Sequence, residues 1–270
     1  MYCDSGILFC FYVAVRPAGG RSAIYAEILF RNLLAFFIVG AGLVRKPEKL
    51  EIHKGDLKFL FLRSICGTVG IVCNFYAIDH LVLSDANMLN KLSPFFTIIF
   101  SYFLLKERLT LFQGIAVVVA FMGALFIIKP TGNMTDPAAL IGMLGGAGAG
   151  AAYSFVRVLG KRGVNGKLIV MFFSAFTCVF ALPFLIGHFA PMKWWQVAAM
   201  IAAGFGGAGG QIFVTKAYFY APAKEISVFD YSQIMFSALM GFLVLGQKPD
   251  MLSLCGYVII CTTAVCMYFL

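Results

Sequence analysis

The sequence predicts an all-α membrane protein of about ten transmembrane helices, arranged as two inverted five-helix repeats. Three observations lead to this prediction. The 270 residues are 61% hydrophobic and only 12% charged, whereas an ordinary soluble domain carries roughly 25% charged residues. Apolar runs reach about 20 residues before a charge interrupts them, which is enough for a helix to cross a bilayer. The chain also matches itself at an offset of about 140 positions.

The apolar runs that can cross roughly 30 Å of hydrocarbon as helices follow one another along the chain. They cover residues 24–43, 59–78, 82–105, 111–128, 138–158, 168–186, 195–214, 226–245 and 251–270. Residues 1–15 offer a shorter first helix that contains Asp4, and we expect this helix to be incomplete or truncated. A signal peptide is the alternative interpretation, but the segment has no basic n-region and no clear cleavage site.

Lysine and arginine are unevenly divided between alternating connections, and cytoplasmic connections retain the excess. The connections with many lysine and arginine residues are 45–58, counted together with Arg63, then 106–108, 157–167 and 216–224. The connections with few of them hold Arg16, Arg21, Lys129, Lys193 and Lys248. We therefore expect a multi-pass protein of the plasma membrane with both termini in the cytoplasm. The same asymmetry explains the net charge of +9, so no nucleic-acid partner is expected.

The internal match superposes the third to fifth spans on the eighth to tenth. It pairs Gly67 with Gly207, Gly70 with Gly210, Ala77 with Ala217, Asp85 with Glu225, Phe96 with Phe236 and Leu105 with Leu245. We expect one repeat in residues 1–130 and a second in residues 138–270. Because each repeat holds an odd number of spans, the second must enter the membrane with the opposite polarity.

Residues 83–130 carry a series of short motifs: Asp85-Ala86, then Ser93-Pro94, then Leu-x-Glu-Arg-Leu over residues 105–109, then an apolar tail that ends at Pro130. In this order they resemble the EamA-type drug/metabolite transporter superfamily. Residues 225–260 echo the pattern, with Gln247 where that family usually has glutamate, and residues 30–32 resemble its second helix. The resemblance implies ten helices, two EamA repeats, alternating access and a central cavity.

Ionisable groups at membrane depth cost several kcal/mol unless they are paired or hydrated. Lys91 lies in the middle of the fourth predicted span, and Asp230 lies near the start of the ninth, at the repeat position of Asn90. We expect Lys91 and Asp230 to form an intramembrane pair that lines or gates the cavity. The alternative is that both side chains snorkel or only hold helices together.

Other polar groups in the spans are candidates for the substrate cavity, because an apolar site needs a few oriented polar groups. They are Asn74, Asn87, Asn90, Ser93, Tyr153, Gln211, Tyr231 and Gln233. Each of them is also a candidate for a simple interhelical hydrogen bond.

Three further features concern helix structure. Glu27 and Arg31 stand four residues apart in the favourable order, which predicts a structural charge pair. Pro94 removes a backbone donor within the fourth span and predicts a kink. The glycines at 142, 146 and 150 share one helix face and predict close contact between helix backbones.

The residue pattern argues against several classes of function. The eight cysteines and three histidines form no metal-binding spacing, no catalytic constellation and no cofactor motif. We expect no enzyme, no metal and no cofactor; an intramembrane enzyme and a channel-like or scaffold protein are the alternatives. The favoured interpretation is a secondary transporter that moves a small organic metabolite, such as an amino acid, a sugar or a drug-like amphiphile, by alternating access. Expected partners are the lipid bilayer and a small-molecule substrate, and a homodimer is compatible with the sequence.

Overall fold

A computed structural model of the chain describes residues 21–45, 55–81, 83–106, 110–128, 137–187, 193–221, 242–243, 246 and 250–269. Every regular element in these ranges is a helix. The predicted span 1–15 lies outside the described residues, as does the predicted span 226–245 apart from Phe242 and Leu243.

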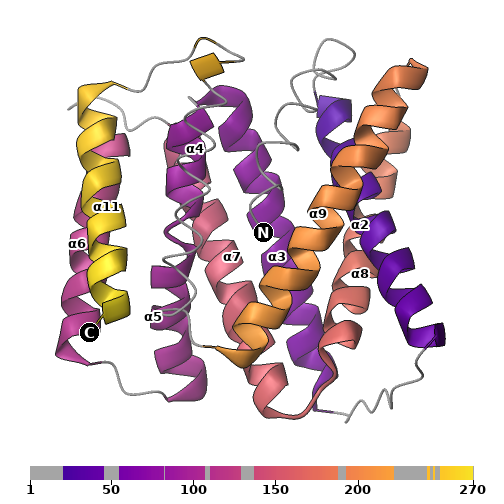
Figure 1. Cartoon of the computed structure of the whole chain (residues 1–270), viewed down its shortest axis with the longest axis horizontal. Coiled ribbons are helices and arrows are strands. Elements are labelled where there is room, and N and C mark those ends of the chain that lie inside the picture. The colour runs from indigo at the N-terminus through magenta and orange to yellow at the C-terminus, as the bar shows by residue number, and fades with distance from the viewer. Residues whose placement is uncertain are drawn as a thin grey trace. The chain divides into compact units, whose positions relative to one another are not determined.

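The helices follow the predicted spans closely. Their bounds are α2 Arg21–Arg45, α3 Leu57–His80, α4 Leu83–Asn90, α5 Ser93–Leu105, α6 Leu111–Ile128, α7 Pro137–Lys161, α8 Gly166–Gly187, α9 Trp194–Tyr220 and α11 Met251–Phe269 (Figure 1). One predicted span, 82–105, corresponds to two helices, α4 and α5. The prediction of an all-α protein is confirmed, and each other predicted span within the described ranges corresponds to one helix.

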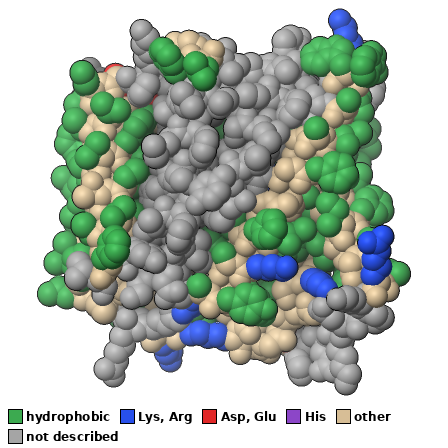
Figure 2. All heavy atoms as spheres, in the orientation of Figure 1, with side chains coloured by type: hydrophobic (Ala, Val, Ile, Leu, Met, Phe, Trp, Pro, Cys, Tyr) green, Lys and Arg blue, Asp and Glu red, His purple; other side chains and the backbone are tan. Residues whose placement is uncertain are grey.

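Five stretches of the described residues are long and apolar enough to cross a membrane: Ile28–Arg45, Leu57–His80, Asp85–Leu105, Pro137–Lys161 and Gly166–Ile186. The shorter helices are apolar as well, and they turn large side chains outward. Val118 of α6 is 62% exposed, whereas Ala120 and Ala124 on its other side are buried. Figure 2 shows hydrophobic side chains along α11 in the same way. Small residues inside and large apolar residues outside are typical of helices that face lipid.

The helices form two compact units, and each unit combines parts of both predicted repeats. The first unit comprises residues 1–64 and 159–220, and the second comprises residues 65–158 and 221–270. In the first unit, α2 packs against α8 and α9. In the second unit, α6 packs against α11. Figure 1 shows the helices of each unit.

In the first unit, α2 and α8 occupy equivalent positions in the two repeats, and they run antiparallel. The ring of Tyr25, near the start of α2, stacks on Phe184, near the end of α8, with centroids 4.9 Å apart. Further along α2, the carbonyl oxygen of Leu29 lies 3.9 Å from the sulfur of Cys178, which is earlier in α8. From Tyr25 to Leu29 the residue number rises along α2, whereas from Phe184 to Cys178 it falls along α8. The two helices therefore run antiparallel.

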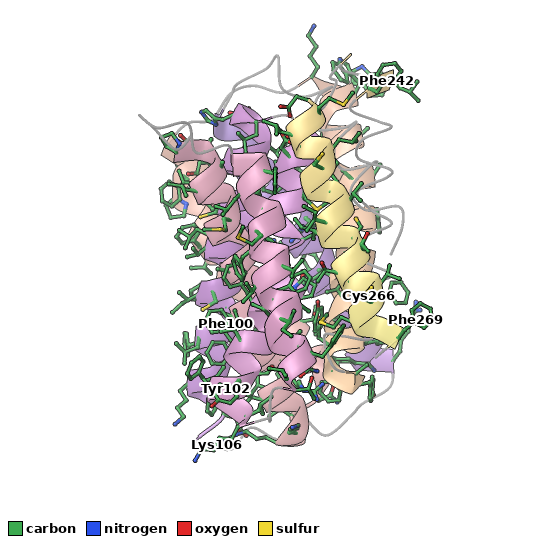
Figure 3. The ribbon with its side chains drawn as sticks, turned by 90° about the vertical axis from the view of Figure 1, so that its left-hand side faces the viewer. Phe100, Tyr102, Lys106, Phe242, Cys266 and Phe269 are labelled. Atoms are coloured by element: carbon green, nitrogen blue, oxygen red, sulfur yellow. The ribbon has the colours of Figure 1, made fainter. Side chains whose placement is uncertain are left out.

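In the second unit, α6 and α11 are likewise equivalent helices of the two repeats. Figure 3 places Lys106, shortly before α6, toward the end at which α11 finishes with Phe269, and Phe242 at the opposite end. The two helices therefore run antiparallel. A Cβ on Gly123 would lie 2.8 Å from the side chain of Ile260, so the contact is close. Equivalent helices that run in opposite directions are what an inverted repeat requires.

An ion pair joins the connection before α3 to the connection after α7. The Arg162 Nη1 atom lies 3.0 Å from the Oδ1 atom of Asp56, whose side chain is buried. The guanidinium also lies 4.5 Å from the ring centroid of Phe59. These two connections therefore lie together at one end of the helices.

Candidate functional site

The fourth predicted span is divided in its middle, where Lys91 and Leu92 form a turn between α4 and α5. The backbone N–H of Lys91 still donates to the carbonyl of Asn87 at 3.0 Å, but the N–H of Leu92 donates to Leu89, only three residues back, at 3.2 Å. Because Pro94 has no N–H, it cannot donate to the carbonyl of Asn90. In many carriers, helices interrupted at membrane depth supply the backbone groups of the substrate site.

The glycine face of α7 lies directly against this interruption. A Cβ on Gly146 would lie 2.6 Å from the carbonyl oxygen of Leu89, and one on Gly150 would lie 2.7 Å from that of Ser93. These distances are too short for any side chain larger than hydrogen. The backbones of α7 and of the α4–α5 segment therefore touch, which confirms the contact that the glycine spacing predicts.

Two hydroxyl groups fasten α5 to α7. The Thr97 hydroxyl lies within hydrogen-bond distance of two carbonyls, those of Ser93 at 2.8 Å and of Gly150 at 3.2 Å. The Ser154 hydroxyl lies 3.0 Å from the Gly150 carbonyl and 3.2 Å from the Thr97 carbonyl. All three of Thr97, Ser154 and Gly150 are buried, so α5 is held in place along this part of α7.

On its other side, α7 packs against α3. A Cβ on Gly70 would lie 2.9 Å from the backbone nitrogen of Ala149, and one on Gly145 would lie 3.1 Å from that of Asn74. The Oδ1 atom of Asn74 is buried and has no hydrogen-bond partner among the described residues. An acceptor in this state costs free energy unless water or a ligand bonds to it.

The structure places most of the predicted cavity residues in the second unit, around α7. Asn87 and Ser93 are buried on α4 and α5, whereas Asn90 and Lys91 at the interruption are half-buried. Also half-buried are Asn74 of α3 and Tyr153 of α7. The interruption and the α3–α7 contact thus bring backbone atoms of Asn74, Asn90 and Ser93 against one glycine-lined helix.

The remaining predicted residues are not part of this group. Gln211 belongs to α9 in the first unit, where its amide donates to the Thr215 hydroxyl at 3.3 Å. Asp230, Tyr231 and Gln233 lie outside the described residues. The pairing of Lys91 with Asp230 therefore stays a prediction.

The predicted Glu27–Arg31 pair also stays a prediction, because the side chain of Glu27 is not described. The side-chain methylenes of Arg31 occupy the place that a Cβ on Gly207 of α9 would take. The next residue, Asn32, is buried and donates from its amide to the carbonyl of Ile28 at 2.8 Å. In this part of the first unit, α2 and α9 thus make close contact around a polar pair of residues.

The sequence-based placement of Arg63 among the loop charges is wrong. Arg63 lies within α3 and is 2% exposed, and its guanidinium carbon lies 3.7 Å from the ring centroid of Phe173 in α8. A cation over an aromatic face is stabilised by the ring quadrupole, and more strongly when water is excluded. In the sequence, the position of Arg63 inside an apolar run was the feature that indicated a place within the helix.

Sequence reasoning also missed a hydrogen bond between α4 and α11. The Tyr257 hydroxyl donates to the Oδ1 atom of Asp85 at 2.5 Å, and both side chains are buried. Asp85 stood out in the sequence through its Asp-Ala motif and its repeat partner Glu225, but nothing there indicated Tyr257.

Metal binding gains no support within the described ranges, which contain no group of three or more His, Cys, Asp or Glu suited to an ion.

A family profile described as the EamA-like transporter family matches residues 10–129 and 140–269. The pseudopaline exporter CntI of Pseudomonas aeruginosa (strain UCBPP-PA14) is 30% identical to this chain, over 90% of this chain and 85% of that protein. Solute carrier family 35 member G1 of Mus musculus is 25% identical, over 82% of this chain and 64% of that protein. One solved crystal structure has a TM-score of 0.63 over 96% of this chain and 93% of its own, at 16% identity, and therefore shares the fold.

Proposed function

Because the chain belongs to the EamA-like transporter family and is therefore a membrane transporter, we propose that it is a secondary carrier that moves a small organic solute by alternating access. Its two repeats would be residues 1–130 and 138–270. The chain contains no Walker motif, so the energy for accumulation would come from an ion gradient or from solute exchange.

The observation that carries this proposal is the antiparallel packing of equivalent helices. The α2–α8 pair shows it through its contacts at Tyr25 and Leu29, and the α6–α11 pair shows it through the positions of Lys106 and Phe269 in Figure 3. In a carrier built from inverted repeats, each repeat can adopt the conformation of the other, which closes one side of the membrane and opens the other. A helical protein without this symmetry would need one structural change to open the site to the first side of the membrane and an unrelated change to open it to the second.

The solute would bind at the interruption between α4 and α5, with Lys91, Asn87 and Asn90 as the polar groups that contact it. Support comes from the half-buried position of Lys91 at mid-span and from the Asn90 carbonyl, which Pro94 leaves without its helical donor. Lys91 would pair with Asp230 when no solute is bound, since an ionised group at this depth needs a partner.

The carrier would reside in the plasma membrane with both termini in the cytoplasm. The Asp56–Arg162 ion pair supports the assignment of residues 45–58 and 157–167 to one face, and their high content of lysine and arginine supports the cytoplasmic face. Cysteine labelling from each side of the membrane would test this orientation.

The proposed function is tested in two steps with the purified full-length protein. A thermal-shift screen against a metabolite library that includes pseudopaline identifies the solute, since a ligand of the folded state raises its apparent stability. Counterflow in proteoliposomes is then measured with that solute. A carrier shows faster uptake of labelled solute when unlabelled solute is present inside, whereas a channel shows no such stimulation.

A further inference from the structure

The short helix α4 is attached to the second unit in a different way from α5. Its end, at Leu89 and Asn90, rests on the backbone of Gly146, and near its start Asp85 accepts the hydrogen bond from Tyr257. By contrast, α5 is fastened to α7 through Thr97 and Ser154. A movement of α4 alone would therefore leave α5 and α7 in contact.

The interruption after α4 has the properties of a hinge. The Asn87 carbonyl accepts a hydrogen bond from the N–H of Lys91, four residues later, as in a regular α-helix. The Leu89 carbonyl accepts one from the N–H of Leu92, only three residues later. The Asn90 carbonyl cannot receive its bond because residue 94 is proline. Because the regular pattern of backbone hydrogen bonds is broken at this point, α4 can change its direction relative to α5 at a low cost in free energy.

Tyr257 connects this hinged helix to a rigid support. It stands on α11, whose long contact with α6 buries Gly123 against Ile260. Neither α6 nor α11 contains a charged residue. The ionisable side chains of this unit nearest in sequence to Asp85, among the described residues, are Asp79 and His80 at the end of α3 and Lys91 at the hinge.

Building on the proposed function, we propose that Asp85 and Tyr257 are positioning residues of the carrier, and that their hydrogen bond is a latch that opens and closes in each transport cycle. When the bond is made, α4 is held against the α6–α11 pair, and Asn87, Asn90 and Lys91 are set at the solute site. When it breaks, α4 turns about the hinge and the site opens toward one side. A hydrogen bond suits this purpose, because its net free energy is small enough to be exchanged for contacts with the solute.

The latch is tested by hydrogen–deuterium exchange of the full-length protein in nanodiscs. In Tyr257→Phe we expect the amides of α4, residues 83–90, to exchange faster by on the order of tenfold, because a hydrogen bond to a carboxyl group is lost. The amides of α5 and α7 should keep their wild-type rates. Tyr102→Phe is the matched control, since Tyr102 is exposed on α5, and it should leave all rates unchanged.

The double variant completes the test. Asp85→Ala combined with Tyr257→Phe should raise the exchange of α4 by less than the sum of the two single effects, because both substitutions remove the same bond. The latch is wrong if Tyr257→Phe leaves α4 unchanged, if exchange rises equally over α4, α5 and α7, or if the two substitutions are additive. This readout needs no solute, so the latch can fail while counterflow succeeds, and counterflow can fail while the latch stands.

Discussion

The surroundings of α7 and the α6–α11 pair belong to the same unit but are built on different principles. Around α7, glycines bring helix backbones into contact, and polar side chains of α3, α4 and α5 lie beside them. In the α6–α11 pair, small residues such as Ala120 and Ala124 are buried, and large apolar residues such as Val118 and Val258 are exposed. Both helices of this pair lack charged residues.

This difference indicates a division of labour. Lipid offers no hydrophobic driving force between helices, so helices associate through close packing and hydrogen bonds. The α6–α11 pair packs closely and has no charged residue in either helix, which suits a supporting role. The α7 region combines packing with polar groups at mid-span, which cost free energy and are retained where a protein needs them for function.

The largest expected effect on stability comes from the glycine contacts of α7. In Gly150→Ala the new Cβ would lie 2.6 Å from the Cβ of Phe96 and 2.7 Å from the carbonyl oxygen of Ser93. Because both distances are too short, α5 and α7 must separate. We expect the free energy of unfolding to fall by about 2–3 kcal/mol. Unfolding in detergent, followed by intrinsic fluorescence, measures this loss.

Gly114→Ala in α6 is the matched control, because a Cβ there meets nothing within 4 Å. It should leave stability unchanged or raise it slightly, since alanine favours a helix over glycine by up to about 1 kcal/mol. Equal losses in the two variants would contradict the assignment of the Gly150→Ala loss to the α5–α7 contact.

A smaller effect is expected where the end of α7 meets the start of α3. Asp56→Ala removes a buried carboxylate from the Arg162 guanidinium, which is 45% exposed, so solvent screens part of the loss. We expect a decrease of about 1–2 kcal/mol, and a coupling energy of about 1 kcal/mol in a double-mutant cycle with Arg162→Ala. Lys216→Ala, on the exposed face of α9, serves as the control partner in the same cycle, and there the two substitutions should be additive.

The smallest effect separates two threonines that look alike in the sequence. The Thr97 hydroxyl donates within its own helix to Ser93 and also reaches Gly150 of α7. The Thr263 hydroxyl of α11 donates within its own helix, to the Ile259 carbonyl at 2.7 Å. Thr97→Val should therefore cost about 1 kcal/mol and Thr263→Val less than about 0.5 kcal/mol. The reverse order, in the same unfolding measurement, would contradict the assignment of the hydroxyl contact to the α5–α7 interface.

The helical architecture could be predicted because lipid imposes strict rules on a chain. Each span needs a long apolar run, and so the prediction for residues 111–128 has the same bounds as α6. The glycines of α7 were informative for a similar reason, since their spacing follows the helical period. The motifs of residues 83–130 also led to the correct family.

The pairing of side chains could not be predicted in the same way. Asp85 and Tyr257 are 172 residues apart, and no periodicity in the sequence links them. Arg63 was misplaced because a charge close to the end of an apolar run resembles a charge at the membrane surface, and the aromatic ring that accommodates it lies on another helix. The candidate cavity residues could be named by type, but only the structure shows that the backbones of Asn74, Asn90 and Ser93 lie against α7.

The central claim is that the carrier binds its solute at the interruption between α4 and α5, and counterflow by Lys91→Ala tests it most directly. With the solute found in the thermal-shift screen and equal amounts of folded protein, Lys91→Ala should slow counterflow at least about tenfold, the effect of losing one charged contact with the solute. Lys106→Ala, at the exposed end of α5, should keep the wild-type rate. Wild-type counterflow in Lys91→Ala would contradict the claim.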